Sequence, residues 1–156
     1  MLELKKMDHA PLVGEGSVCF SKDQTTLYGA NQNLVGSIEF SDKKFKNLRK
    51  INLAGNRLTS IVLNNINNLI HLLIFGNYIN KLDISCNSKL ILLDVWSNNI
   101  TSFSVSKNSS LKFLYIPGNP LKEFIVSEEQ IKNLKDPESG YYWELDFPNS
   151  KWTITK

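Results

Sequence analysis

The strongest constraint on this sequence is a 21-residue repeat that occurs four times, in phase and without a gap. The copies are residues 48–68, 69–89, 90–110 and 111–131. Position 1 is always leucine, positions 4 and 6 are always aliphatic, position 9 is always asparagine, and positions 11, 14 and 16 are always apolar. One such repeat cannot bury its apolar face alone, so consecutive copies must stack as coils of a solenoid around a shared core.

The asparagine at position 9 follows an alternating stretch that is typical of a short strand. The chain must turn there, and a turn inside a core leaves backbone groups that need partners. An asparagine side chain offers both donors and an acceptor to such groups. We therefore expect a structural ladder of asparagines, Asn56, Asn77, Asn98 and Asn119, and a second, partial ladder at position 19 from Asn87 and Asn108.

The four segments match the pattern LxxLxLxxNxL and so resemble the leucine-rich-repeat family, in particular its short bacterial variety. The resemblance implies an α/β-type, mostly β, right-handed solenoid. Its parallel sheet would line the concave face, and short extended or 3₁₀-like segments near 61–64, 82–85, 103–106 and 124–127 would line the convex face. It also implies a protein-binding scaffold, since such repeats usually serve that role.

The ends of the chain are expected to cap this solenoid within a single domain, 1–156. Residues 1–47 form the expected N-terminal cap, which includes a degenerate repeat at 27–47 with Asn31 or Asn33 at the ladder position. Residues 132–156 form the expected C-terminal cap. Ser127 and Gln130 have the spacing of a capping box for a helix near 128–135, and the alternating stretches YYWELDF and KWTITK predict a β-hairpin after it.

Composition excludes several other classes of protein. No apolar run reaches the length of a membrane span, about eighteen residues, and no signal peptide is recognisable. We therefore expect a cytoplasmic protein, or a secreted or surface protein whose signal has been removed. Residues 48–126 carry eight Lys/Arg against three acids, net +5, which is too diffuse to predict nucleic-acid binding. Cys19 and Cys86 are far apart, so reduced thiols are expected.

Sequence signatures of catalysis are absent. The histidines are His9 and His71, and an Asp94 near His71 would still lack a nucleophile or a metal. We expect no catalytic residue, no cofactor and no metal site.

The variable positions of the repeat hold the candidate functional residues. Positions 3, 5 and 7 should point outward from the strands, and residues one repeat apart should become neighbours on adjacent strands, about 4.8 Å apart. Large apolar residues concentrate there in the last three repeats, which is typical of an interaction surface. The candidate binding residues are His71, Leu73, Phe75, Leu92, Asp94, Trp96, Phe113 and Tyr115.

We expect this surface to recognise a protein or peptide. Two alternatives remain open for the same face: recognition of a carbohydrate or cell-surface glycan, in which Trp96, Phe75 and Tyr115 stack on sugar rings, and self-association as a homodimer. A terminal segment of the chain could also cover the patch.

Overall fold

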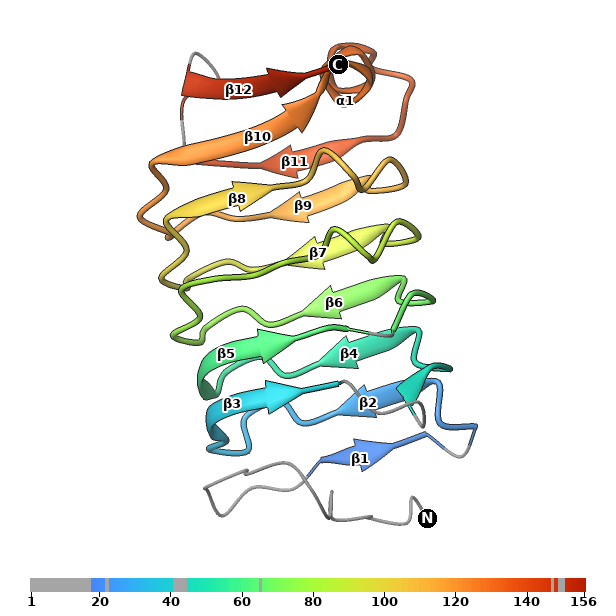
Figure 1. The fold of residues 1–156 in the computed structure, drawn as a ribbon, viewed down its shortest axis with the longest axis vertical. Helices are drawn as coiled ribbons and strands as arrows, with labels where there is room; N and C mark the ends of the chain where they lie inside the picture. The colour runs from blue at the N-terminus through green and yellow to red at the C-terminus, as the bar shows by residue number, and fades with distance from the viewer. Residues whose placement is uncertain (1–17, 22, 41–44, 65, 147, 149–150) are drawn as a thin grey trace.

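The protein is a mostly β solenoid with one helix, seen in a computed structural model that describes residues 18–156 except 22, 41–44, 65, 147 and 149–150. The first seventeen residues of the expected N-terminal cap therefore lie outside the described residues. Strands that are one coil apart in the sequence lie side by side and run parallel (Figure 1). The stacked coils predicted from the repeat are confirmed.

One face of the solenoid is a seven-stranded sheet in the order β1-β2-β4-β6-β7-β9-β11. All its neighbours are parallel except β1 and β2, which are antiparallel. Apart from the two-residue β1, each strand has three residues, which correspond to positions 3 to 5 of the repeat. The strands are β1 (Cys19–Phe20), β2 (Thr26–Tyr28), β4 (Lys50–Asn52), β6 (His71–Leu73), β7 (Leu92–Asp94), β9 (Phe113–Tyr115) and β11 (Tyr142–Glu144).

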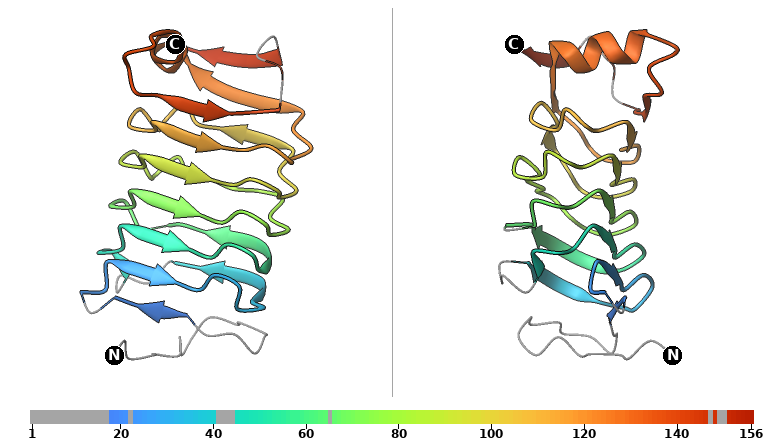
Figure 2. Two further views of the ribbon diagram at one scale, coloured as in Figure 1. Left: turned by 180° about the vertical axis from the view of Figure 1, so that it is seen from behind. Right: turned by 90° about the vertical axis from the view of Figure 1, so that its right-hand side faces the viewer.

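The opposite face carries two smaller parallel sheets (Figure 2). One pairs β3 (Val35–Glu39) with β5 (Arg57–Val62), and the other places β10 (Glu123–Ser127) between β8 (Ser102–Ser104) and β12 (Trp152–Thr155). This face is more regular than the short segments expected from the sequence. Among the four repeats, as far as their residues are described, the one that contains residues 81–84 is alone in having no strand on this side.

The core lies between these two faces and is filled by the repeated apolar positions. Every residue at positions 1, 4 and 6 of the four repeats is fully buried, and Phe103 and Phe124 at position 14 stack with ring centroids 6.4 Å apart. Because each coil contributes the same layer of side chains, the core is continuous along the stack.

The position-9 asparagines are buried and connect neighbouring coils. Asn77 is representative: its Oδ1 accepts from Leu58 N at 3.0 Å, and its Nδ2 donates to the carbonyls of Leu53 and Ile74, each at 3.0 Å. One side chain thus pairs backbone groups of its own coil and of the coil before it. The ladder does not continue at Asn31 or Asn33, which are both exposed.

The helix α1 (Glu128–Lys135) begins at the predicted capping box. Ser127 Oγ accepts from Gln130 N, and Gln130 Oε1 accepts from Ser127 N. Gln130 also continues the second asparagine ladder, because its buried Nε2 donates to the carbonyls of Val105 and Asn108. The sequence pattern missed this second role, because Gln130 stands one position after the ladder position.

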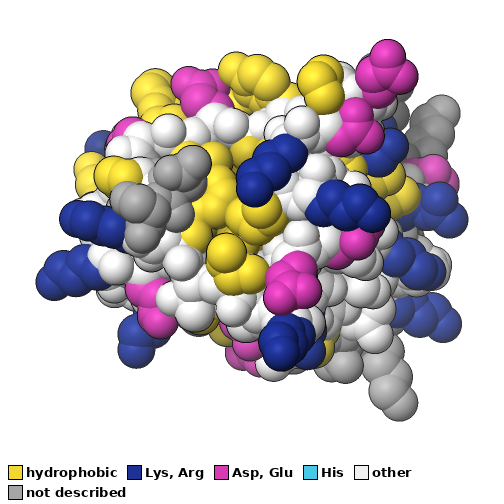
Figure 3. Space-filling view, turned by 90° about the horizontal axis from the view of Figure 1, so that it is seen from above, with side chains coloured by type: hydrophobic (Ala, Val, Ile, Leu, Met, Phe, Trp, Pro, Cys, Tyr) yellow, Lys and Arg dark blue, Asp and Glu magenta, His cyan; other side chains and the backbone are white. Residues whose placement is uncertain are grey.

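The predicted C-terminal hairpin is wrong. β11 pairs in parallel with β9, and β12 pairs in parallel with β10, so the two strands extend different sheets and form a further coil. Alternation within a segment identifies a strand but not its partner, and the open edges of β9 and β10 offered unpaired backbone groups to both segments. Seen from this end, hydrophobic side chains gather near the centre, with charged side chains around them (Figure 3).

The described residues contain no helix that is both long and apolar enough to cross a membrane. Cys86 is a free, exposed thiol.

Candidate functional site

The seven-stranded sheet presents two rows of outward side chains, because the middle residue of each strand points into the core. Parallel pairing places residues one repeat apart side by side, as Leu73 with Asp94 and Leu92 with Phe113 show. The first row is Lys50, His71, Leu92, Phe113 and Tyr142, and the second is Tyr28, Asn52, Leu73, Asp94, Tyr115 and Glu144. The register predicted from the repeat length is confirmed.

Large apolar side chains from three neighbouring repeats and from β11 gather on this sheet. We call the set the aromatic face: Leu73, Phe75, Leu92, Trp96, Phe113, Tyr115 and Tyr142. Trp96 is 50% exposed, Phe113 36% and Tyr142 53%, whereas the others are partly buried. The rings also support one another, with centroids 6.3 Å apart for Phe75 and Trp96 and 5.8 Å apart for Tyr115 and Tyr142.

His71 lies at the N-terminal border of the aromatic face, between Lys50 and Leu92 in the register. Partial burial lowers its pKa, and the charge of Lys50 lowers it further. Both effects favour the neutral form of the imidazole. Asp94 is opposite Leu73 rather than His71, so the two residues do not sit side by side on the sheet.

Asp94 is a charged residue within the aromatic face, and it is partly buried. Its Oδ1 accepts from Trp96 N at 3.2 Å. Burial raises the pKa of its carboxyl, the hydrogen bond from Trp96 opposes the rise, and the nearby charge of Glu144 adds to it. The charged neighbour that affects Asp94 is thus a second carboxylate rather than a cation.

A hollow of about 170 Å³ lies where β7, β9 and β11 end. Its walls are formed by Asp94, Trp96, Tyr115, Pro117 and Glu144. Two aromatic side chains and two carboxylates thus meet around one open space, and three of these five residues were candidate binding residues from the sequence.

Tyr142 and Glu144 were missed by sequence reasoning because their segment was assigned to a hairpin. Tyr142 follows its neighbour Phe113 by 29 residues instead of 21, and the eight extra residues equal the length of α1. The signal was present in the sequence: Tyr142, Trp143 and Glu144 repeat the outward–inward–outward pattern of Phe113, Leu114 and Tyr115. Tyr28, which is 51% exposed, was also missed and extends the second row beyond Asn52.

A third carboxylate near the hollow, Asp146, already has a structural partner. In three earlier coils the amide N–H at position 8 donates to a carbonyl of the next coil, as Ser97 does to Pro117 at 2.9 Å. The last of these amides, on Gly118, donates to Asp146 Oδ2 at 2.8 Å. Asp146 therefore replaces a backbone acceptor at the end of the stack.

Within the described residues, no group of three or more His, Cys, Asp or Glu side chains is arranged to hold a metal ion. Comparison of the sequence with models of protein families found no match, and comparison with curated proteins found no significant match.

Proposed function

We propose that this protein is a leucine-rich-repeat solenoid that binds a protein or peptide through the aromatic face and has no catalytic chemistry of its own. The repeat LxxLxLxxNxL supports the assignment, together with the parallel strand that begins at position 3 of each repeat. The binding role rests on one observation: aromatic side chains, with Trp96 and Tyr142 half exposed, stand on a sheet whose core positions are already filled.

These side chains are not part of the core, which is filled by the fully buried inward residues of the same strands. Contiguous exposed apolar groups are typical of interaction surfaces, and aromatic residues are enriched at the centres of such surfaces. Lys50 and His71 form a polar border on one side, Glu144 stands beside Tyr115 on the other, and Asp94 lies within the face. This arrangement favours an ordered contact over non-specific adhesion.

The test is a selection of short randomised peptides on the purified protein, followed by affinity measurements with the selected peptides. Trp96→Ala should weaken binding by at least about thirtyfold, the effect of losing a residue worth about 2 kcal/mol. Its thermal midpoint should stay close to that of the wild type. Asn64→Ala, at an exposed position away from the sheet, is the matched control and should bind normally.

Peptides that bind Trp96→Ala as tightly as the wild type would show that the aromatic face is not the binding site. A thermal midpoint of the Trp96→Ala variant far below that of the wild type would contradict the premise that this ring is outside the core.

A glycan is the second candidate for the same face. It is favoured by Trp96 standing beside the carboxylates of Asp94 and Glu144, because sugars stack on aromatic rings and donate hydroxyl hydrogen bonds. A glycan array distinguishes it from a peptide. Self-association predicts a mass in sedimentation equilibrium that rises with concentration and falls to that of the monomer in Trp96→Asp.

A further inference from the structure

The hollow beside Trp96 has the size of a pocket for one side chain. Its volume of about 170 Å³ is below the range of about 300–1,000 Å³ found for pockets that hold drug-sized molecules. It opens onto the aromatic face, since Trp96 and Tyr115 belong to both. A peptide lying on the face could therefore place one side chain in it.

The walls of the hollow favour a positively charged group. Asp94 and Glu144 each bring a carboxylate, and the described residues place no cation beside Asp94 that affects its pKa. Asp94 uses one oxygen for the Trp96 N–H, which leaves further acceptor capacity on the carboxylate. Burial of part of this carboxylate strengthens its attraction for a cation, because fewer water molecules screen it.

The aromatic walls add a second attraction of the same sign. Trp96 is half exposed and its ring lies against Phe75, and the Tyr115 ring lies against Tyr142. Aromatic faces attract cations, and tryptophan does so most strongly. A planar guanidinium can stack on a ring and bond a carboxylate at its edge, which an ammonium group cannot do as well.

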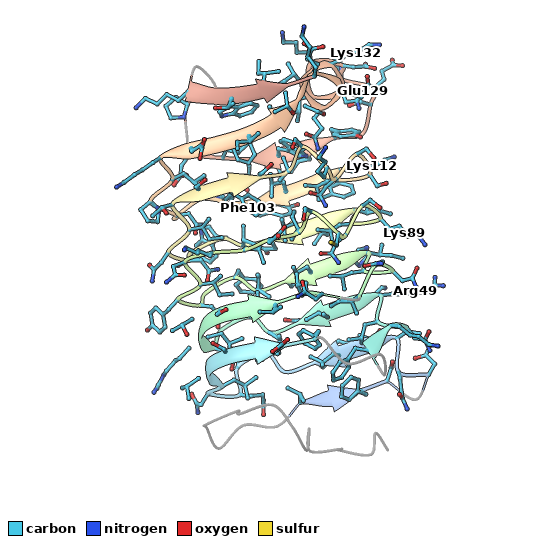
Figure 4. The ribbon with its side chains drawn as sticks, viewed as in Figure 1. Arg49, Lys89, Phe103, Lys112, Glu129 and Lys132 are labelled. Atoms are coloured by element: carbon cyan, nitrogen blue, oxygen red, sulfur yellow. The ribbon has the colours of Figure 1, made fainter. Side chains whose placement is uncertain are left out.

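Charge also differs between the two edges of the sheet. Arg49, Lys50 and Lys112 lie where the strands begin, and Figure 4 shows Arg49, Lys89 and Lys112 along one side of the stack. The hollow lies at the other edge, where the strands end. Asp94 and Glu144 are the last residues of β7 and β11, so these carboxylates are separated from Arg49, Lys50 and Lys112 by the length of the strands.

We propose that the hollow formed by Asp94, Trp96, Tyr115, Pro117 and Glu144 binds the guanidinium group of an arginine side chain in the partner peptide. This inference rests on the proposed function and adds the chemical identity of one anchor. Lysine is the weaker ligand for the same site.

The probe is N-acetyl-arginine amide, titrated at low ionic strength against the isotope-labelled full chain, with the Trp96 indole N–H signal as the readout. We expect this signal to shift and saturate, while the buried indole N–H of Trp143 stays unchanged. The neutral analogue N-acetyl-citrulline amide should cause little shift. Asp94→Asn and Glu144→Gln should each weaken binding by about two- to thirtyfold, and Asp83→Asn, on another part of the surface, should not.

An equal shift with citrulline, or no shift with arginine, would overturn the proposal. The peptides selected on the purified protein test the proposed binding function independently of the arginine pocket. Some selected peptides could require Trp96 for binding but keep their affinity when arginine is replaced by citrulline. Such peptides would support the aromatic face as the binding site and contradict the arginine pocket. Peptides whose affinity is the same for the wild type and for Trp96→Ala would contradict the proposed binding function of the aromatic face.

Discussion

Asn77 shows how a single side chain links two coils. It pairs one amide and several carbonyls, among them those of Leu53 in the coil before and Ile74 in its own coil. We predict that Asn77→Ala lowers the free energy of unfolding by roughly 1–3 kcal/mol, because buried backbone groups lose their partners. Urea denaturation measures the loss. Asn64→Ala should change it by less than about 0.5 kcal/mol, and an equal effect of the two substitutions would contradict the structural role.

Asp94 should make stability depend on pH in the unusual direction for an aspartate. Its pKa in the folded state is raised above the ordinary value of 3.8, mainly by burial. The ionised carboxylate therefore destabilises the fold above the folded-state pKa, and this penalty disappears as the pH falls through that value toward 3.8. We predict that Asp94→Asn is more thermostable than the wild type at pH 7 and that the difference vanishes in acid.

Asp83 provides a control of opposite sign for the same thermal melts. Hydrogen bonds from the Ser85 hydroxyl and amide lower the pKa of Asp83. This carboxylate stabilises the fold above 3.8 and loses that effect as the pH falls below it, so Asp83→Asn should be less stable than the wild type at pH 7. A lower midpoint for Asp94→Asn at pH 7 would refute the predicted cost of its charge.

At the scale of elements, the start of α1 joins a helix cap to the core of the solenoid. Gln130 accepts from Ser127 N and donates to the carbonyls of Val105 and Asn108, and it is fully buried. We predict that Gln130→Ala costs roughly 2–3 kcal/mol, since two bonds to buried carbonyls and one to the part-buried Ser127 amide are lost. Ser127→Ala should cost only about 1 kcal/mol, the usual value of an N-cap. Equal losses in urea denaturation would mean that Gln130 acts through the cap alone.

The sequence predicts elements well where its period is constant and poorly where the period breaks. The spacing of Leu72, Leu93 and Leu114 was sufficient to predict the strands, their parallel register and the outward residues beside them. The helix inserted before β11 changes the spacing from 21 to 29 residues, so the last coil could not be recognised by period alone. One of the two carboxylates of the hollow, Glu144, comes from that coil, so the repeat period alone could not predict the pocket.

At the scale of the whole molecule, each coil contacts only its neighbours, and stability should grow with the number of coils. We predict that insertion of a second copy of residues 69–89 after Lys89 gives a folded protein with a higher thermal midpoint. The added copy begins and ends at equivalent positions, so every Asn-mediated contact between coils can form again. A scrambled 21-residue insert is the control and should lower the midpoint. Circular dichroism measures both, and destabilisation by the ordered copy would contradict independent stacking.

The hydrogen bonds between coils have a mechanical consequence. They run along the axis of the stack, and β1 and β12 lie at its opposite ends (Figure 1). A force that pulls these ends apart loads the bonds of one coil at a time instead of shearing a whole sheet at once. The molecule should therefore extend under tension in separate steps, each releasing one repeat, or roughly 70 Å of chain. Asp146, whose carboxylate holds the amide of Gly118, stands at the coil that would open first from the C-terminal end.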